Sequence, residues 1–456
     1  MAVFWHFFYC PEPEGRRGQQ KSICGKPTRS MEWNRYGPFL FCCQNVRKDL
    51  YRISGWIKQP PENGEKKRKV VETMNETKVF ADDYRGVFRR QEDFLECLKS
   101  IGIHSSWERK QTKNLRLVAV TEESQVAKDL KEQYARDGLD EDIITDTIVN
   151  TGLVLKVRNQ YYPVRGCAIK SILDRAGIGG SGLKRVEKSV YARILNECLR
   201  KTKGDALLRI SEGKVSAVLG GDSSEYAILD MEQIFLHAVD YLEKNYKGCQ
   251  YVGGFYEHDM TSALWELSGE DELLEAYQKE LRLHGKTAME MKPLVRITTS
   301  DTGAGGANIY PMLVCGSDSR TIALGTPLRL SHRNRRGIGE FDAQLKQLYA
   351  KYQLAAGNLT KLLDVEIMNP VNCMKGVMDK MEIAMKYKAE AVDLFVSQYG
   401  EDPCTAHDIY YGISEILFML ACEGAEGSRI TRMEEVIARA LSFDWSSYDI
   451  PGAYKW

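Results

Sequence analysis

The amino-acid sequence predicts an α+β protein, in which a core of mixed strands and helices is followed by a helical C-terminal region. Two pairs of short apolar runs between Gly152 and Leu219 are separated by turn residues, as in β-hairpins. Segments with helical periodicity alternate with strand-like runs through residues 74–337. From Phe341 onward, apolar residues recur at helical spacing. These three patterns are typical of the α+β class.

The length and composition indicate a globular protein. The chain has 456 residues, of which 43% are hydrophobic and 28% charged, so it is long enough for two or three domains. No stretch approaches the roughly 20 apolar residues of a membrane helix, and Met1–Tyr9 lacks the basic region and cleavage site of a secretory signal. The twelve cysteines are scattered, which favours free thiols in a reducing cytoplasm.

Residues 1–73 differ from the rest of the chain and divide it into three predicted parts. They hold 14 of the 63 Lys and Arg and 7 of the 63 Asp and Glu, leaving 49 basic and 56 acidic residues beyond. We interpret 1–73 as a poorly ordered basic extension, or as a leader outside the native protein with Met74 as the true start. The α+β domain follows at 74–337, and 338–456 is a helical region packed on or following it.

The expected elements follow in chain order. Residues 74–112 suit short helices, with Phe88, Phe94 and Leu98 at helical spacing. Strands are expected at Leu115–Val120, Gly152–Val157, Tyr161–Val164, Ala206–Ile210, Val215–Leu219, Tyr251–Tyr256, Leu294–Thr299, Tyr310–Cys315 and Thr321–Leu330. Helices are expected at Glu122–Ala135, Cys167–Ala176, Val186–Arg200, Met231–Asn245 and Asp271–Leu283.

Four amphipathic helices are expected in the last third. They span Phe341–Leu362, Pro370–Gly400, Thr405–Ala421 and Ile430–Leu441. Thr405 and Asp408 have the spacing of a helix N-cap and an acidic residue in the first turn. These helices also offer an interface for a homo-oligomer.

Two segments in this region resemble a known family. Leu328–Arg333, which leads into the Phe341 helix, and the downstream Cys404–Glu415 are similar to the pattern of the phage- and plasmid-borne domain of unknown function 932. The resemblance covers Leu294–Asp444 and extends weakly into the middle of the chain, but not into 1–73. His407 and Tyr411 stand where the family commonly has Tyr and Asn. The resemblance implies a mobile genetic element and a shared fold, and no catalytic residue.

The densest cationic segment of the chain lies just before the Phe341 helix. Its candidate nucleic-acid-binding residues are Arg329, His332, Arg333, Arg335 and Arg336. Guanidinium groups bind phosphate oxygens and stack on bases. A localised patch on a mildly acidic body favours a single strand over a duplex, whose binding needs broad phosphate neutralisation. The alternative is a solvated loop that pairs with Glu340 and Asp342.

A glycine-rich segment supplies two further candidates. Gly177–Gly182 matches G-x-G-x-x-G, but the dinucleotide fingerprint needs a preceding strand and Ile169–Ala176 reads as a helix. A helix C-cap and linker is the simpler interpretation. The exposed amides beside Lys184 and Arg185 would still suit a backbone phosphate.

No pattern predicts a metal site or a cofactor. The sequence has no C-x-x-C and no H-E-x-x-H, and Glu257-His258-Asp259 is the nearest ligand-like cluster. The leading prediction is a non-enzymatic, nucleic-acid-binding accessory protein of a mobile element. The alternatives are a hydrolase-type enzyme with carboxylates on the strand-exit loops at Asp222 and Asp301, and a protein-binding or structural component. Carboxylates that meet His258 would favour the enzyme.

Overall fold

The computed structural model describes residues 78–456 apart from 271, 287–290 and 316–319. All of these residues belong to one compact unit, Leu50–Trp456. The predicted extension or leader at 1–73 lies outside the described residues. Helices and antiparallel sheets are combined in the described chain, so the predicted α+β class is confirmed.

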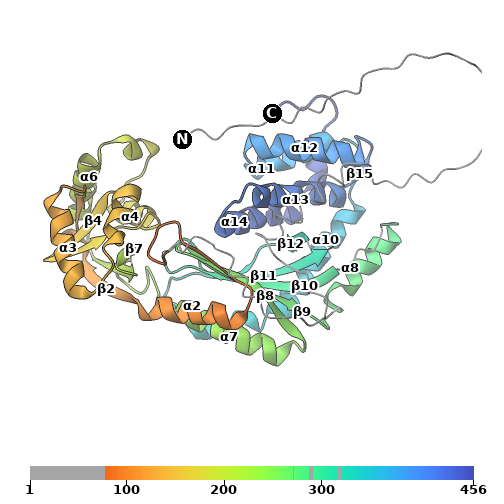
Figure 1. Cartoon of the computed structure of the whole chain (residues 1–456). Coiled ribbons are helices and arrows are strands. Elements are labelled where there is room, and N and C mark those ends of the chain that lie inside the picture. Colours follow the sequence, from red (N-terminus) through yellow and green to blue (C-terminus); the bar gives the residue numbers. More distant parts are fainter. Residues whose placement is uncertain (1–77, 271, 287–290, 316–319) are drawn as a thin grey trace, which may run out of the picture. The chain divides into compact units, whose positions relative to one another are not determined.

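The largest sheet of the described residues is antiparallel and has seven strands (Figure 1). Its strand order is β1-β8-β9-β10-β11-β12, with β13 also paired to β11. The strands are β1 Arg85–Phe88, β8 Cys249–Glu257, β9 Met260–Leu267, β10 Met291–Thr299, β11 Ala307–Cys315, β12 Arg320–Ala323 and β13 Leu328–Leu330. Antiparallel pairing lets consecutive strands join by short turns, and two residues suffice between β8 and β9.

Helices cover both faces of this sheet (Figure 1). The helices α2 (Gln91–Ile103) and α7 (Met231–Asn245) lie on one face, and α14 (Gly427–Ala438) lies on the other. Successive side chains of a strand point to opposite faces. Trp265 of β9 therefore packs against Phe235 of α7, while the preceding Leu264 belongs to a cluster with Ala438 of α14. All eight residues of β9 are buried as a result.

Two three-stranded sheets form a smaller lobe with orders β2-β6-β7 and β3-β4-β5. Their strands are β2 Ser105–Gln111, β3 Arg116–Ala119, β4 Leu153–Val157, β5 Gln160–Pro163, β6 Asp205–Ser211 and β7 Lys214–Gly220. The helices of this lobe are α3 Gln125–Asp137, α4 Asp142–Asn150, α5 Ala168–Ala176 and α6 Lys188–Lys201, with the 3₁₀ turns η1 Thr112–Asn114 and η2 Ser181–Arg185. The lobe buries two hydrophobic clusters of its own.

Both predicted hairpins and the five helices of the middle of the chain are confirmed, the last as α8 Glu272–Leu283. The helical interpretation of 74–112 is wrong in part, because Phe88 lies in β1 and the strand β2 follows α2. Pairing with β6 makes β2 a strand although Glu108 and Lys110 have low strand propensity. The strand β9 and the helix α4 were not expected.

The predicted strand Thr321–Leu330 is two strands, β12 and β13. Gly325 interrupts it with a φ of 131°, a conformation that only glycine adopts readily. Both strands then pair with β11, at different positions along it.

The last third is helical, but two of the four predicted helices are each divided. Its helices are α9 Ile338–Leu345, α10 Leu348–Lys361, α11 Pro370–Lys380, α12 Met385–Tyr399, α13 Ala406–Cys422 and α14. Glu382 has a φ of 56° and separates α11 from α12, which periodicity could not show. Thr405 and Asp408 form the reciprocal N-cap of α13, as predicted.

The remaining short elements connect these helices. They are η3 Leu362–Asp364, β14 Glu366–Ile367, β15 Cys404–Thr405, η4 Arg439–Ser442 and η5 Trp445–Tyr448. Within the described ranges, none of the helices has the length and apolar character needed to cross a membrane.

Candidate functional site

The arginine-rich segment predicted from the sequence follows β13 and precedes α9. The side chains of Arg333 and Arg335 are exposed, Arg336 is half-buried, and His332 is buried. The segment is therefore held by one side chain inside the protein, with its guanidinium groups at the surface.

Backbone hydrogen bonds fix the conformation of this segment. The amides of Asn334 and Arg335 donate to the carbonyls of Ser224 and Ser223, each at 3.0 Å. Asn334 and Arg335 have φ values of 61° and 57°, in the left-handed region. Such a conformation costs on the order of 1–3 kcal/mol for a non-glycine residue and persists only where the surroundings impose it. The loop is a built feature that directs its arginines outward.

The buried side chain of His332 holds the arginine-rich segment in place by its contacts inside the protein. Its ring stacks on Tyr226 with centroids 5.0 Å apart and an angle of 7°, and its Nδ1 donates to the Ala227 carbonyl at 3.1 Å. Burial lowers the pKa of His332. The imidazole is therefore a neutral internal support rather than a surface cation.

Arg329 differs from the other arginines because it is already paired. Its guanidinium forms an ion pair with Glu435 of α14. Among the residues that the structure describes, Arg333, Arg335 and Arg336 form no ion pair. These three retain their capacity for an external anion.

The two acidic residues expected to neutralise this loop each make another contact as well. Glu340 accepts a hydrogen bond from the Gly337 amide at 2.8 Å and so caps α9. Asp342 lies 3.0 Å from Nδ1 of His237. The Gly337 amide and, to a smaller extent, the charge of Arg336 lower the pKa of Glu340, so this carboxylate partly balances Arg336 as the alternative expects.

The structure adds Arg109 of β2 to this surface. Hydrogen bonds from Ser224, together with the charges of Arg335 and Arg109, lower the pKa of Asp222. Both arginines thus lie near one carboxylate, although 226 positions separate them in the sequence. Arg109 could not be predicted from the sequence. The polar residues Glu108 and Lys110 on either side of it obscure the alternating pattern that places Trp107 and Arg109 on one face of β2.

The glycine-rich segment lies elsewhere. Gly177 ends α5 with a φ of 68°, as a helix C-cap, and the preceding element is a helix as predicted. Arg185 is exposed at the end of η2, while the side chain of Lys184 lies outside the described residues. In the described part of the chain, no hydrogen bond or ion pair joins Arg185 to the arginine-rich segment.

A second candidate is an open cavity of about 590 Å³ where the two lobes meet. Its charged lining consists of Asp82, Asp83, Glu257, Asp259 and Glu426 with Arg85, Lys170 and Arg432. The cations on its rim pair with carboxylates: Arg85 with Glu426 at 2.8 Å, Arg432 with Asp259 at 2.6 Å and Lys170 with Asp174 at 2.6 Å.

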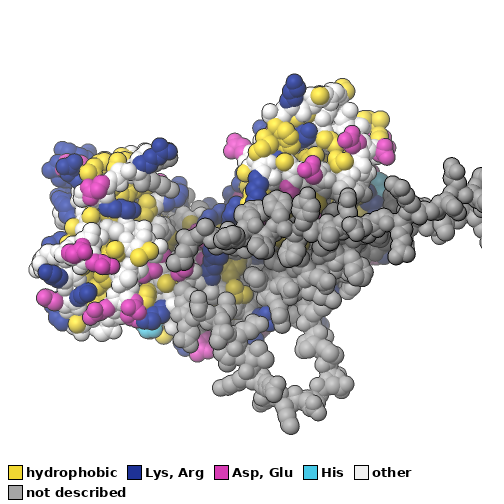
Figure 2. All heavy atoms as spheres, turned by 45° about the horizontal axis from the view of Figure 1, so that its top comes forward, with side chains coloured by type: hydrophobic (Ala, Val, Ile, Leu, Met, Phe, Trp, Pro, Cys, Tyr) yellow, Lys and Arg dark blue, Asp and Glu magenta, His cyan; other side chains and the backbone are white. Residues whose placement is uncertain are grey.

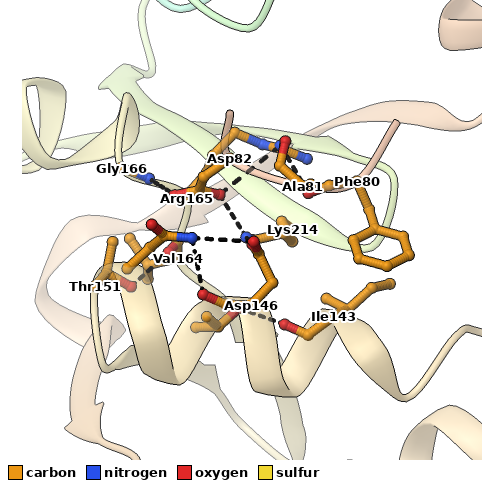
Figure 3. Close-up of polar contacts among 12 residues, drawn as sticks. Phe80, Ala81, Asp82, Ile143, Asp146, Thr151, Val164, Arg165, Gly166 and Lys214 are labelled. Atoms are coloured by element: carbon orange, nitrogen blue, oxygen red, sulfur yellow. Dashed lines mark hydrogen bonds and ion pairs between the residues drawn. The ribbon is translucent and has the colours of Figure 1, made fainter. Parts of the chain in front are cut away.

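A buried ionic network lies behind the cavity (Figure 3). Lys214 is fully buried and lies 2.5 Å from both Asp82 and Asp146, which come from different segments. Arg165, 1% exposed, donates to the Phe80 carbonyl at 2.9 Å and lies 3.8 Å from Asp82. A buried charge is tolerated only when it is paired and hydrogen-bonded, so this network joins the segment before β1 to the smaller lobe. The only sign of this network in the sequence is that single cationic residues, Lys214 and Arg165, lie next to apolar strands.

His258 is engaged by the same network. Its Nε2 lies 2.5 Å from Nη1 of Arg165. Burial and the Arg165 charge hold the pKa of His258 well below its usual value, so the ring is neutral. A nitrogen occupied by a buried cation is poorly placed to accept a proton from a substrate.

The other groups proposed for chemistry are also occupied. Glu257 accepts hydrogen bonds from the amides of Gly427 and Ser428 at the start of α14, at 2.8 and 3.1 Å. Asp301 pairs with Arg209 at 2.6 Å. In residues 78–456, with the stated gaps, no group of three or more His, Cys, Asp or Glu side chains is arranged to hold a metal ion.

No protein-family model, no curated protein and no solved structure matches this chain. The resemblance to the phage and plasmid family therefore stays a prediction from the two motifs.

Proposed function

We propose that this protein binds single-stranded nucleic acid without catalysing a reaction on it. The binding site is a surface formed by Arg109, Arg333, Arg335 and Arg336, called here the arginine surface. The observation that carries the proposal is the strained, hydrogen-bonded loop that presents Arg333 and Arg335 at the surface without an ion pair among the described residues. On the motif resemblance alone, we also propose a role as an accessory protein of a mobile genetic element, in the cytoplasm.

The chemistry of these side chains suits phosphate. A guanidinium donates paired hydrogen bonds to phosphate oxygens and stays charged at any physiological pH. Held in a fixed loop, the arginines lose less conformational entropy on binding than they would on a flexible chain. The loop is thus organised for an anion before the anion arrives.

The surrounding surface favours a single strand over a duplex. In the parts of Figure 2 that are not grey, Lys and Arg side chains are interspersed with Asp and Glu rather than forming one wide field of positive charge. Duplex binding relies on neutralising many phosphates at once, whereas a localised groove or patch suffices for a single strand.

The test is a fluorescence-anisotropy titration with single- and double-stranded oligonucleotides at two salt concentrations. Replacing both Arg333 and Arg335 by alanine should weaken single-strand binding by about 2 kcal/mol, at about 1 kcal/mol per exposed charged contact, or close to thirty-fold. The slope of log K against log salt should fall by about 1.4, since each single-strand phosphate contact contributes about 0.7.

The matched control removes two arginines from other surfaces. Arg136 on α3 and Arg282 on α8 are exposed and form no ion pair among the described residues. Their double alanine variant should bind like the native chain. Absence of binding at low salt, or equal losses in both variants, would refute the proposal.

The enzyme alternative has one observation in its favour, since the cavity brings Asp82, Asp259 and Glu257 beside His258. Against it, His258 faces Arg165 and Asp301 pairs with Arg209. The proposal of a binding protein explains the unpaired arginines, which the enzyme alternative does not.

A further inference from the structure

We infer that the bound strand continues from the arginine surface onto a second basic surface at the junction of η1, β3 and α6. This inference rests on the proposed function and deepens it, because it states where the strand runs and why a longer strand binds more tightly. The second surface, called here the α6 patch, consists of Lys113, Arg116, Arg193, Arg200, Lys201 and Lys203.

The α6 patch is assembled by a specific clamp. Asn196 of α6 binds the free edge of β3, accepting from the Leu117 amide at 2.7 Å and donating to the Leu117 carbonyl at 2.8 Å. Arg193 and Arg200 lie three residues before and four residues after Asn196, so they are its neighbours along one helix face. Arg116 precedes Leu117. One asparagine therefore gathers cations from a helix and a strand.

Cations outnumber carboxylates in this patch. All six side chains are exposed; Glu197 pairs with Arg200, the charge of Arg193 acts on Glu187, and the exposed Asp205 follows Lys203 by two residues. Like charges so close repel one another, which is unfavourable in the absence of an anionic partner. Figure 2 shows Lys and Arg side chains gathered at the upper left, over the region where Figure 1 places α6.

A half-buried arginine, Arg175, links the α6 patch to the loop that holds the arginine surface. Arg175, 11% exposed, donates to Thr112 Oγ1 at 3.0 Å and to the carbonyls of Lys203 and Asp205 at 3.0 and 2.7 Å. Its other nitrogen lies 3.6 Å from Glu225. The same side chain thus contacts η1, the loop that carries Lys203, and the loop that holds the arginine surface.

The two loops also touch directly. The Gly221 amide donates to the Asp205 carbonyl at 2.8 Å, and a Cβ on Gly221 would lie 2.6 Å from that oxygen. Two residues further on, Ser223 and Ser224 hold the backbone of Arg335 and Asn334. Backbone hydrogen bonds therefore link the segment of Arg335 to the loop of Lys203, and the exposed Asp205, Asp222 and Glu225 lie in the linking loops. The bases of a single strand can turn away from such a path while its phosphates follow it.

The experiment compares oligonucleotide lengths. Native protein is titrated with single strands of about 6 and about 24 nucleotides, which bracket typical site sizes. The patch variant replaces Lys113, Arg116 and Arg193 by alanine. We expect the native chain to bind the longer strand at least tenfold more tightly, and the patch variant to lose most of that gain while binding the short strand as before.

A matched control stays within the smaller lobe. Lys128, Lys131 and Arg136 are three exposed cations on α3, and their triple alanine variant should keep the length dependence. Circular dichroism of each variant verifies that it is folded. Arg333→Ala combined with Arg335→Ala should weaken both lengths.

The outcomes separate the two proposals. Loss of binding in the arginine-surface variant, with the patch variant unchanged on the longer strand, overturns the inference and leaves the proposed function standing. Absence of any binding by the native protein overturns both. Competition by polyglutamate as effective as that by the oligonucleotide would show an acidic protein to be the partner, and overturns the assignment to nucleic acid.

Discussion

Replacing Lys214 by methionine should be among the most destabilising single changes in the smaller lobe. The lysine is fully buried and its ammonium group lies 2.5 Å from both Asp82 and Asp146. Methionine has a similar length, so the substitution removes the charge and leaves little empty space.

The magnitude follows from the charges of the network. Two cations, Lys214 and Arg165, face two carboxylates, Asp82 and Asp146. Without the lysine, the Asp146 carboxylate, 18% exposed, has no counter-charge, and breaking a buried ion pair in this way costs at most about 3–5 kcal/mol. The free energy of unfolding, measured by urea denaturation followed by circular dichroism, should fall by up to that amount.

A double variant tests the electrostatic origin of the effect. Adding Asp146→Asn to Lys214→Met restores neutrality, because Asp82 keeps Arg165, and should recover a large part of the lost stability. Lys131→Met on the exposed face of α3 is the control and should change stability by less than about 0.5 kcal/mol. A Lys214→Met variant as stable as this control, or a double variant no better than the single one, would refute the reasoning.

Three further predictions concern the rest of the fold. Burial and the nearby Lys286 lower the pKa of His407 from 6.5 to about 4. Between these two values the unfolded chain binds a proton at this residue and the folded chain does not, so the free energy of unfolding should fall as the pH drops from about 6.5 to about 4. Urea denaturation at about pH 7.5 and pH 5 measures this fall, which should be smaller in His407→Gln. A Cβ on Gly306 would press on the Leu330 carbonyl of β13, which leads into the arginine-rich segment. Gly306→Ala should therefore lower the stability measured by thermal unfolding by about 1–3 kcal/mol and weaken oligonucleotide binding. Unchanged binding would contradict this. Thr405→Ala should cost about 1 kcal/mol by loss of the α13 cap, and Thr405→Ser should retain most of it.

Local signals predicted much of the secondary structure. Apolar periodicity located α3, α5, α6, α7 and α13, because each buries one face regardless of which partner covers it. The same rule failed for β2 and β9, whose conformation depends on pairing with distant strands. Helix breaks such as that at Glu382 were invisible, since the apolar spacing continues across them.

The candidate site was predictable in part. Arg333, Arg335 and Arg336 stood out as a cationic run, and the structure leaves them without an ion pair among the described residues. The pairing of Arg329 with Glu435 could not be foreseen, because the two are 106 residues apart and meet only when α14 packs on the sheet. The burial of His332 likewise depends on Tyr226, which belongs to another segment.

Periodicity and composition are local properties of the chain, so the α+β class, the helical last third and the dense arginine run could be predicted before the fold was known. The tertiary structure decided which cations are neutralised. An ion pair or a buried charge depends on residues brought together from distant segments, as Lys214 is with Asp82 and Asp146. For the same reason, the fold alone brings Arg109 and Arg335 near one carboxylate, that of Asp222.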